Sequence, residues 1–79
     1  MVRVRLFAVL REQAGTSEVT DVAGRTVAEL ADILSVRFGE RFAAVAEVSS
    51  FVVNGERASR STPVADGDEV AILPPVSGG

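Results

Sequence analysis

The sequence predicts an α+β fold in which one main helix covers one face of a mixed sheet of about five strands. Three observations predict this class. Apolar and charged residues alternate at the start of the chain, a capped segment near the middle has helical periodicity, and an Asn-Gly pair separates two strand-like segments. At 79 residues, 47% of them hydrophobic, the chain has the size of one small domain.

Residues 1–6 are expected to form the first strand. Val2, Val4 and Leu6 share one parity, and Arg3, Arg5 and Phe7 share the other. Residues 10–15 follow as a polar connection or a single helical turn ending at Gly15. Residues 18–22 then have the pattern of a short second strand.

The main helix is expected to begin after Thr26, an N-cap residue with Glu29 three positions later in capping-box register. Arg37 in the last turn suits the helix dipole, and Gly39 ends the helix. The expected buried stripe consists of Val27, Leu30, Ala31 and Leu34, widened by Ile33.

Three further strands are expected in the second half of the chain. Residues 42–48 form an amphipathic segment, for which a short turn of helix is one option. Asn54-Gly55 then predicts a hairpin between residues 51–53 and 56–58. A turn at residues 66–68 precedes the last strand, residues 69–73, which the proline pair Pro74-Pro75 ends.

This order of elements predicts a β-grasp (ubiquitin-like) arrangement, with the first and last strands parallel and adjacent at the sheet centre. Residues 1–75 would form the domain and residues 76–79 a flexible C-terminal Gly-Gly tail. The sheet face opposite the helix would then be open, and strand parity places Phe7, Ala71 and Leu73 on it. Two interpretations remain for these side chains: a docking surface, or a face covered by residues 42–48.

Composition limits the chemistry that the chain can perform alone. It contains no cysteine and no histidine, so it has no thiol nucleophile, no imidazole base and none of the usual zinc ligands. The net charge of −3 without a basic patch argues against nucleic-acid binding, and the N-terminus resembles neither a signal peptide nor a membrane span. We expect a cytoplasmic protein. All eight basic residues are arginine.

The C-terminus carries the strongest functional indication. Gly78 and Gly79 have no Cβ, so a tail that ends in them can enter a narrow slot and present its carboxylate to an enzyme. The two prolines stiffen the exit from the domain. Fully extended, residues 76–79 would reach about 13 Å.

The segment Asp66–Gly79 resembles the C-terminal signature of the small subunits of molybdopterin synthase, a family of ubiquitin-like sulfur carriers. Its specific part is Gly-Asp-Glu-Val followed by Pro-Pro-Val-x-Gly-Gly at the terminus. The opening strand, the turn at residues 10–12, the capped helix and the chain length are also similar, so the resemblance covers essentially the whole chain.

The resemblance implies that an ATP-using activating enzyme adenylates the Gly79 carboxylate and that a sulfur donor protein converts it to a thiocarboxylate. The tail would then enter the large synthase subunit and donate sulfur to a pterin precursor during molybdenum cofactor biosynthesis. Two copies of each subunit would form a heterotetramer. The small subunit would bind no cofactor, and the catalytic side chains would belong to the large subunit. Gly78 and Gly79 would thread the slot, and the partner-binding residues would be Phe7, Leu73, Pro74, Pro75 and Val76.

Two other functions fit the same residues. The chain could carry sulfur for another pathway, such as thiamin thiazole, cysteine or thio-metabolite synthesis. It could instead be a ubiquitin-like modifier that is joined through Gly79 to lysines of other proteins. Without lysine, it offers no side-chain amine for building isopeptide-linked chains on itself.

Overall fold

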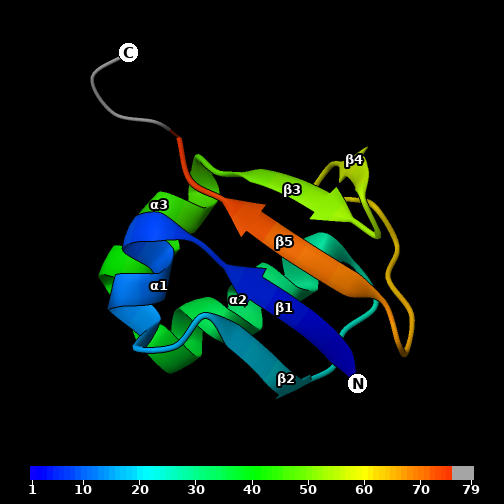
Figure 1. Cartoon of the computed structure of the whole chain (residues 1–79), viewed down its shortest axis with the longest axis horizontal. Helices are drawn as coiled ribbons and strands as arrows, with labels where there is room; N and C mark the ends of the chain where they lie inside the picture. Colours follow the sequence, from blue (N-terminus) through cyan, green and yellow to red (C-terminus); the bar gives the residue numbers. More distant parts are fainter. Residues whose placement is uncertain (76–79) are drawn as a thin grey trace.

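The computed structural model describes residues 1–75, and the predicted tail at residues 76–79 lies outside this range. Five strands form one mixed sheet in the order β2-β1-β5-β3-β4, with three helices (Figure 1). Along the chain the elements are β1 (Val2–Leu6), α1 (Ala8–Ala14), β2 (Glu18–Val22), α2 (Val27–Phe38), α3 (Glu40–Glu47), β3 (Ser50–Val53), β4 (Glu56–Ala58) and β5 (Glu69–Leu73).

The first and last strands lie side by side and parallel at the centre of the sheet, as predicted for a β-grasp fold. Val4 is paired with Val70 and Leu6 with Ile72, and these four side chains are almost completely buried. β2 and β3 add to the outer sides of this pair as antiparallel neighbours. The two ends of the domain are therefore held together in its most protected strands.

The helices lie on one side of the sheet and leave the other side open. Figure 1 shows α2 crossing behind the strands, with α1 and α3 near the end at which β1 and β5 finish. α2 has the predicted cap, because the Thr26 hydroxyl accepts a hydrogen bond from the Glu29 N–H at 3.2 Å. Its buried residues are the four predicted ones, Val27, Leu30, Ala31 and Leu34.

Residues 8–14 form a helix, α1, where the sequence predicts a polar connection or a single turn. Leu10 is completely buried and fixes this short helix to the core. Gly15 ends it in the left-handed conformation, φ 75°, and its N–H donates to the Arg11 carbonyl at 2.9 Å. The alternative of a helical turn that ends at Gly15 is confirmed, although the helix begins two residues earlier than predicted. The alternative of a polar connection is wrong because one buried leucine outweighs the polar residues around it.

The amphipathic segment after α2, for which the sequence offers a short turn of helix, forms the helix α3 over residues 40–47. Phe42 and Ala46, four residues apart, are buried in the same core as β1 and β5. The Phe42 ring centroid lies 5.2 Å from that of Phe38 at the end of α2. This segment packs on the helical side of the sheet, so the alternative in which residues 42–48 cover the open face is wrong.

The predicted hairpin and the last turn are joined by one side chain. Asn54 and Gly55 have φ values of 50° and 82°, as a two-residue hairpin turn requires. The Asn54 amide donates to the Asp68 carboxylate at 3.0 Å, and its oxygen accepts from the Glu69 N–H at 2.9 Å. The hairpin therefore fixes the start of β5.

The helices of the described part of the chain are short, and the longest, α2, has 12 residues. None within residues 1–75 combines the length and the apolar composition that a span across the bilayer needs.

Candidate functional site

The C-terminal end of β5 is held on both sides. β5 pairs with β1 up to Leu6 and Ile72, and with β3 up to Ser50 and Leu73. Pro74, which is half-buried, and Pro75, which is exposed, follow directly. Proline has no N–H for the ladder, so pairing ends here and the chain leaves the middle of the sheet (Figure 1).

Two of the predicted partner-binding residues come together at this exit. Leu6 lies beside Ile72 on parallel strands, so Phe7 and Leu73 follow at matching positions on the opposite face. Phe7 keeps an extended backbone, φ −128° and ψ 152°, before α1 begins. Both side chains are half-buried. The remaining predicted site residues, Val76, Gly78 and Gly79, lie outside the described residues.

A row of side chains that the sequence did not predict as a site crosses the open face next to this pair. The strand pairing places Arg5, Ala71, Val52 and Arg57 side by side on β1, β5, β3 and β4. Both arginines are exposed, whereas Ala71 and Val52 are half-buried. The Arg5 guanidinium carbon lies 5.6 Å from the centre of the Phe7 ring. We call these four residues together with Phe7 and Leu73 the exit patch.

The other end of the open face is different in charge. Arg3 Nε lies 3.7 Å from a Glu18 carboxylate oxygen, and Arg3 Nη1 lies 3.4 Å from a Glu69 carboxylate oxygen. These three side chains are about half exposed, so the pairs contribute little stability. At the end of the face remote from the exit, the one arginine is therefore already paired, and the two carboxylates outnumber it.

The carboxylates with shifted pKa values lie away from the exit patch. Hydrogen bonds from Asn54 and from the Ala65 N–H hold the pKa of Asp68 below its ordinary value. A hydrogen bond and the charge of Arg37, 2.7 Å away, lower the pKa of Asp21. In both cases these contacts stabilise the ionised carboxylate. Asp68 supports the turn before β5, and Asp21 joins β2 to α2. Within residues 1–75 no three acidic side chains are grouped to hold a metal ion.

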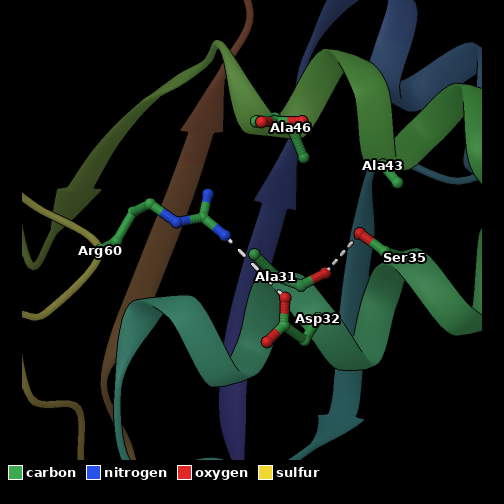
Figure 2. Close-up of a pocket in the computed structure, with 7 residues that line it drawn as sticks. Ala31, Asp32, Ser35, Ala43, Ala46 and Arg60 are labelled. Carbon is green, nitrogen blue, oxygen red and sulfur yellow. Dashed lines mark hydrogen bonds and ion pairs between the residues drawn. The ribbon is translucent and has the colours of Figure 1, made fainter.

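A groove on the helical side is a second candidate site. It lies between α2, α3 and the segment after β4, and Figure 2 shows Arg60 pointing toward Asp32 and Ser35 toward the Ala31 carbonyl. Arg60 reaches toward Asp32 at 3.9 Å, and the Ser35 hydroxyl donates to the Ala31 carbonyl at 2.7 Å. The Arg60 carbonyl also accepts from the Ala28 N–H at 2.8 Å. The Ala28 bond anchors the start of α2, and the other two contacts give Arg60 and Ser35 partners within the protein.

The fold and the exit patch define a ubiquitin-like β-grasp protein that presents its C-terminal strand beside an open sheet face. The sequence profile of the ThiS family matches residues 4–79, so the chain belongs to the ThiS family. It is 39% identical to the molybdopterin synthase sulfur carrier subunit of Escherichia coli (strain K12) over 83 aligned residues, which cover all of both chains.

Solved structures confirm the fold and include proteins with other names. Small archaeal modifier protein 1 from Methanosarcina acetivorans superposes with a TM-score of 0.85 and 32% identity, over 99% of this chain and 95% of that one. The Amycolatopsis orientalis BexX/CysO complex gives a TM-score of 0.82 and 29% identity over the full length of both chains. The complex of molybdopterin-converting factor subunits 1 and 2 from Helicobacter pylori 26695 gives a TM-score of 0.69 and 28% identity, over 99% of this chain and 97% of that one.

Proposed function

We propose that this chain is the sulfur carrier subunit of a molybdopterin synthase and acts in the cytoplasm. The observation that carries the proposal is the 39% identity with the Escherichia coli sulfur carrier subunit over the full length of both proteins. The solved complex from Helicobacter pylori supports binding to a second subunit in a protein of the same fold. The described exit patch offers a surface for such a subunit.

The chemistry belongs to the terminal carboxylate of Gly79. A carboxylate is a poor electrophile. An ATP-using activating enzyme joins the AMP part of ATP to a carboxylate oxygen and releases pyrophosphate, so that this oxygen becomes part of a good leaving group. Sulfur at the oxidation level of sulfide then attacks the carbonyl carbon and displaces AMP. The product is a thiocarboxylate, whose sulfur passes to the pterin precursor. With no cysteine in the chain, the terminal acyl group is the evident place to hold sulfur.

The domain supplies position and recognition in this proposal. Leu73 and Phe7 bind the large subunit from the open face, and Pro74, Pro75 and Val76 direct the chain toward it. Gly78 and Gly79 thread the slot that leads to the pterin. The acids, bases and oxyanion donors come from the large subunit, in a heterotetramer with two copies of each chain.

Reconstitution tests the pathway. The thiocarboxylated protein is mixed with its cognate large subunit and the cyclic pterin precursor, and the dithiolene product is measured. A carboxylate-ended sample is the control, because it has the same fold and no sulfur. We expect dithiolene only from the thiocarboxylated sample. If this sample binds the large subunit and yields no dithiolene, another pathway receives the sulfur.

A second candidate function rests on the closeness of the modifier-protein fold, which superposes with a TM-score of 0.85. In this alternative, Gly79 is joined to lysines of other proteins. Intact-mass analysis separates the two: exchange of one oxygen for sulfur supports a carrier, whereas higher-mass adducts with a branched Gly-Gly remnant support a modifier. The BexX/CysO likeness similarly favours a carrier for a different recipient, which the dithiolene assay distinguishes.

A further inference from the structure

The exit patch combines an apolar centre with a positive margin. Ala71, Val52 and Leu73 on β5 and β3 are half-buried, and no helix within residues 1–75 lies over this face of the sheet (Figure 1). Arg5 and Arg57 lie at the two ends of the row that Ala71 and Val52 occupy. Three strand spacings separate these arginines, about 14 Å between their backbones.

The charge of this patch opposes the charge of the whole molecule. The chain has three more acidic than basic residues, yet within residues 1–75 no carboxylate oxygen lies within salt-bridge distance of Arg5 or Arg57. Glu18 is the strand neighbour of Arg5, but its carboxylate pairs with Arg3. Asp68, near the hairpin that carries Arg57, is hydrogen-bonded to Asn54 and the Ala65 N–H.

One of the two arginines is also held in place. The Arg5 guanidinium lies over the Phe7 ring at 5.6 Å, which restricts its side-chain freedom before any partner binds. An arginine fixed in this way loses less conformational entropy on binding, and its planar group suits a carboxylate better than a lysine does. At the opposite end of the face, Arg3 is already paired with the carboxylates of Glu18 and Glu69.

We propose that the exit patch binds a partner protein whose surface presents an apolar patch between carboxylates, and that these carboxylates pair with Arg5 and Arg57. This inference rests on the proposed function, and it specifies the chemistry of the surface that receives the chain. Leu73, Ala71 and Val52 supply apolar contact. The two arginines fix the orientation of the docked domain, so that the exit from β5 faces the partner.

The test is a titration of the full-length protein against its cognate large synthase subunit at low and high salt. Arg5→Gln and Arg57→Gln are compared with Arg41→Gln, which makes the same charge change at an exposed position of α3. We expect each exit-patch variant to raise Kd about three- to tenfold, and the double variant to lose most of the salt dependence. Arg41→Gln should leave Kd and its salt dependence close to those of the wild type.

Equal Kd values for wild type and double variant, with the thermal melts unchanged, would overturn this inference. Dithiolene formation by the same wild-type pair decides the proposed function separately. If the wild type does not bind the large subunit, the proposed function fails, and the same variants are titrated against the activating enzyme. Weaker binding of the variants to the activating enzyme supports the inference of an acidic partner, and equal binding overturns it. Concentration-dependent self-association through the patch, measured by ultracentrifugation, also overturns it.

Discussion

Leu6 of β1 lies beside Ile72 of β5 in parallel register, with both side chains buried to 1% exposure. This pair brings the ends of the first and last strands together. The next residues, Phe7 and Leu73, therefore lie on the open face at the point where the chain leaves the sheet. The fold thus places a recognition surface directly before the segment that we propose as the reactive one.

Changing Leu73 should affect binding more than stability. Leu73→Asp introduces a charge on the half-buried open face, so we expect Kd for the large subunit to rise about tenfold or more. The matched control is Val36→Asp on α2, because the Val36 side chain is 89% exposed and lies on the helical layer. Calorimetric titration and thermal unfolding check both. A larger loss of stability than of affinity would contradict the role of Leu73.

Truncation of the core should have the opposite effect. Leu34 in α2 is completely buried, and Leu34→Ala leaves a cavity that should lower the free energy of unfolding by roughly 2 to 5 kcal/mol. Urea denaturation measures this loss. At a temperature where the variant is fully folded, its Kd for the large subunit should equal that of the wild type. A weakened Kd under those conditions would mean that the helical layer also contributes to docking.

Stability should fall in acid partly through Asp68. Its pKa is lowered in the folded state, so its ionisation stabilises the fold above its ordinary pKa of 3.8 and this stabilisation disappears as pH falls through the lower folded value. Asn54→Gly removes the amide donor and keeps the positive φ of the turn. The stability difference between wild type and variant should be larger at pH 7 than at pH 2.5. Urea unfolding at both pH values measures this difference in stability. The same difference at pH 7 and at pH 2.5 would exclude the linkage.

The terminal glycine should tolerate no side chain during activation. Gly79→Ala adds a Cβ at the proposed slot, so we expect an unchanged thermal melt and a loss of adenylation or transfer of about tenfold or more. Ser77→Ala, a change in the same segment that adds no atoms, is the control. ATP–pyrophosphate exchange and dithiolene formation measure the two steps. Normal rates in both assays for Gly79→Ala would argue against a narrow slot.

The strands, α2 and the sheet centre follow from local patterns in the sequence. Alternation at Val2, Val4 and Leu6, the Thr26 cap and the Asn54-Gly55 turn each involve neighbouring residues, and each forms as predicted. The helices α1 and α3 depend on tertiary burial instead. Leu10 and Phe42 become core residues only when the sheet and α2 are present to receive them.

Half of the exit patch could be predicted from the sequence, because local alternation along a strand shows which residues share a face. Strand parity alone places Phe7, Ala71 and Leu73 on the open face. The row that joins Arg5 to Arg57 depends on strand order and on the pairing of Val52 with both Ala71 and Arg57. The Asn54-Gly55 turn fixes Val52 opposite Arg57, so these two members of the row follow from the predicted hairpin. The β-grasp prediction places β1 beside β5, but it does not give the register that sets Arg5 beside Ala71 or the pairing of Val52 with Ala71.

The most direct test of the central claim is the mass of the full-length protein after incubation with ATP, its activating enzyme and a sulfur donor. We predict that one oxygen is exchanged for sulfur and that fragmentation places this sulfur on the Gly79 carboxyl group. A protein that keeps its oxygen, under conditions where the same enzymes load another ThiS-family carrier, would contradict the account. Sulfur found on any other residue would contradict it equally.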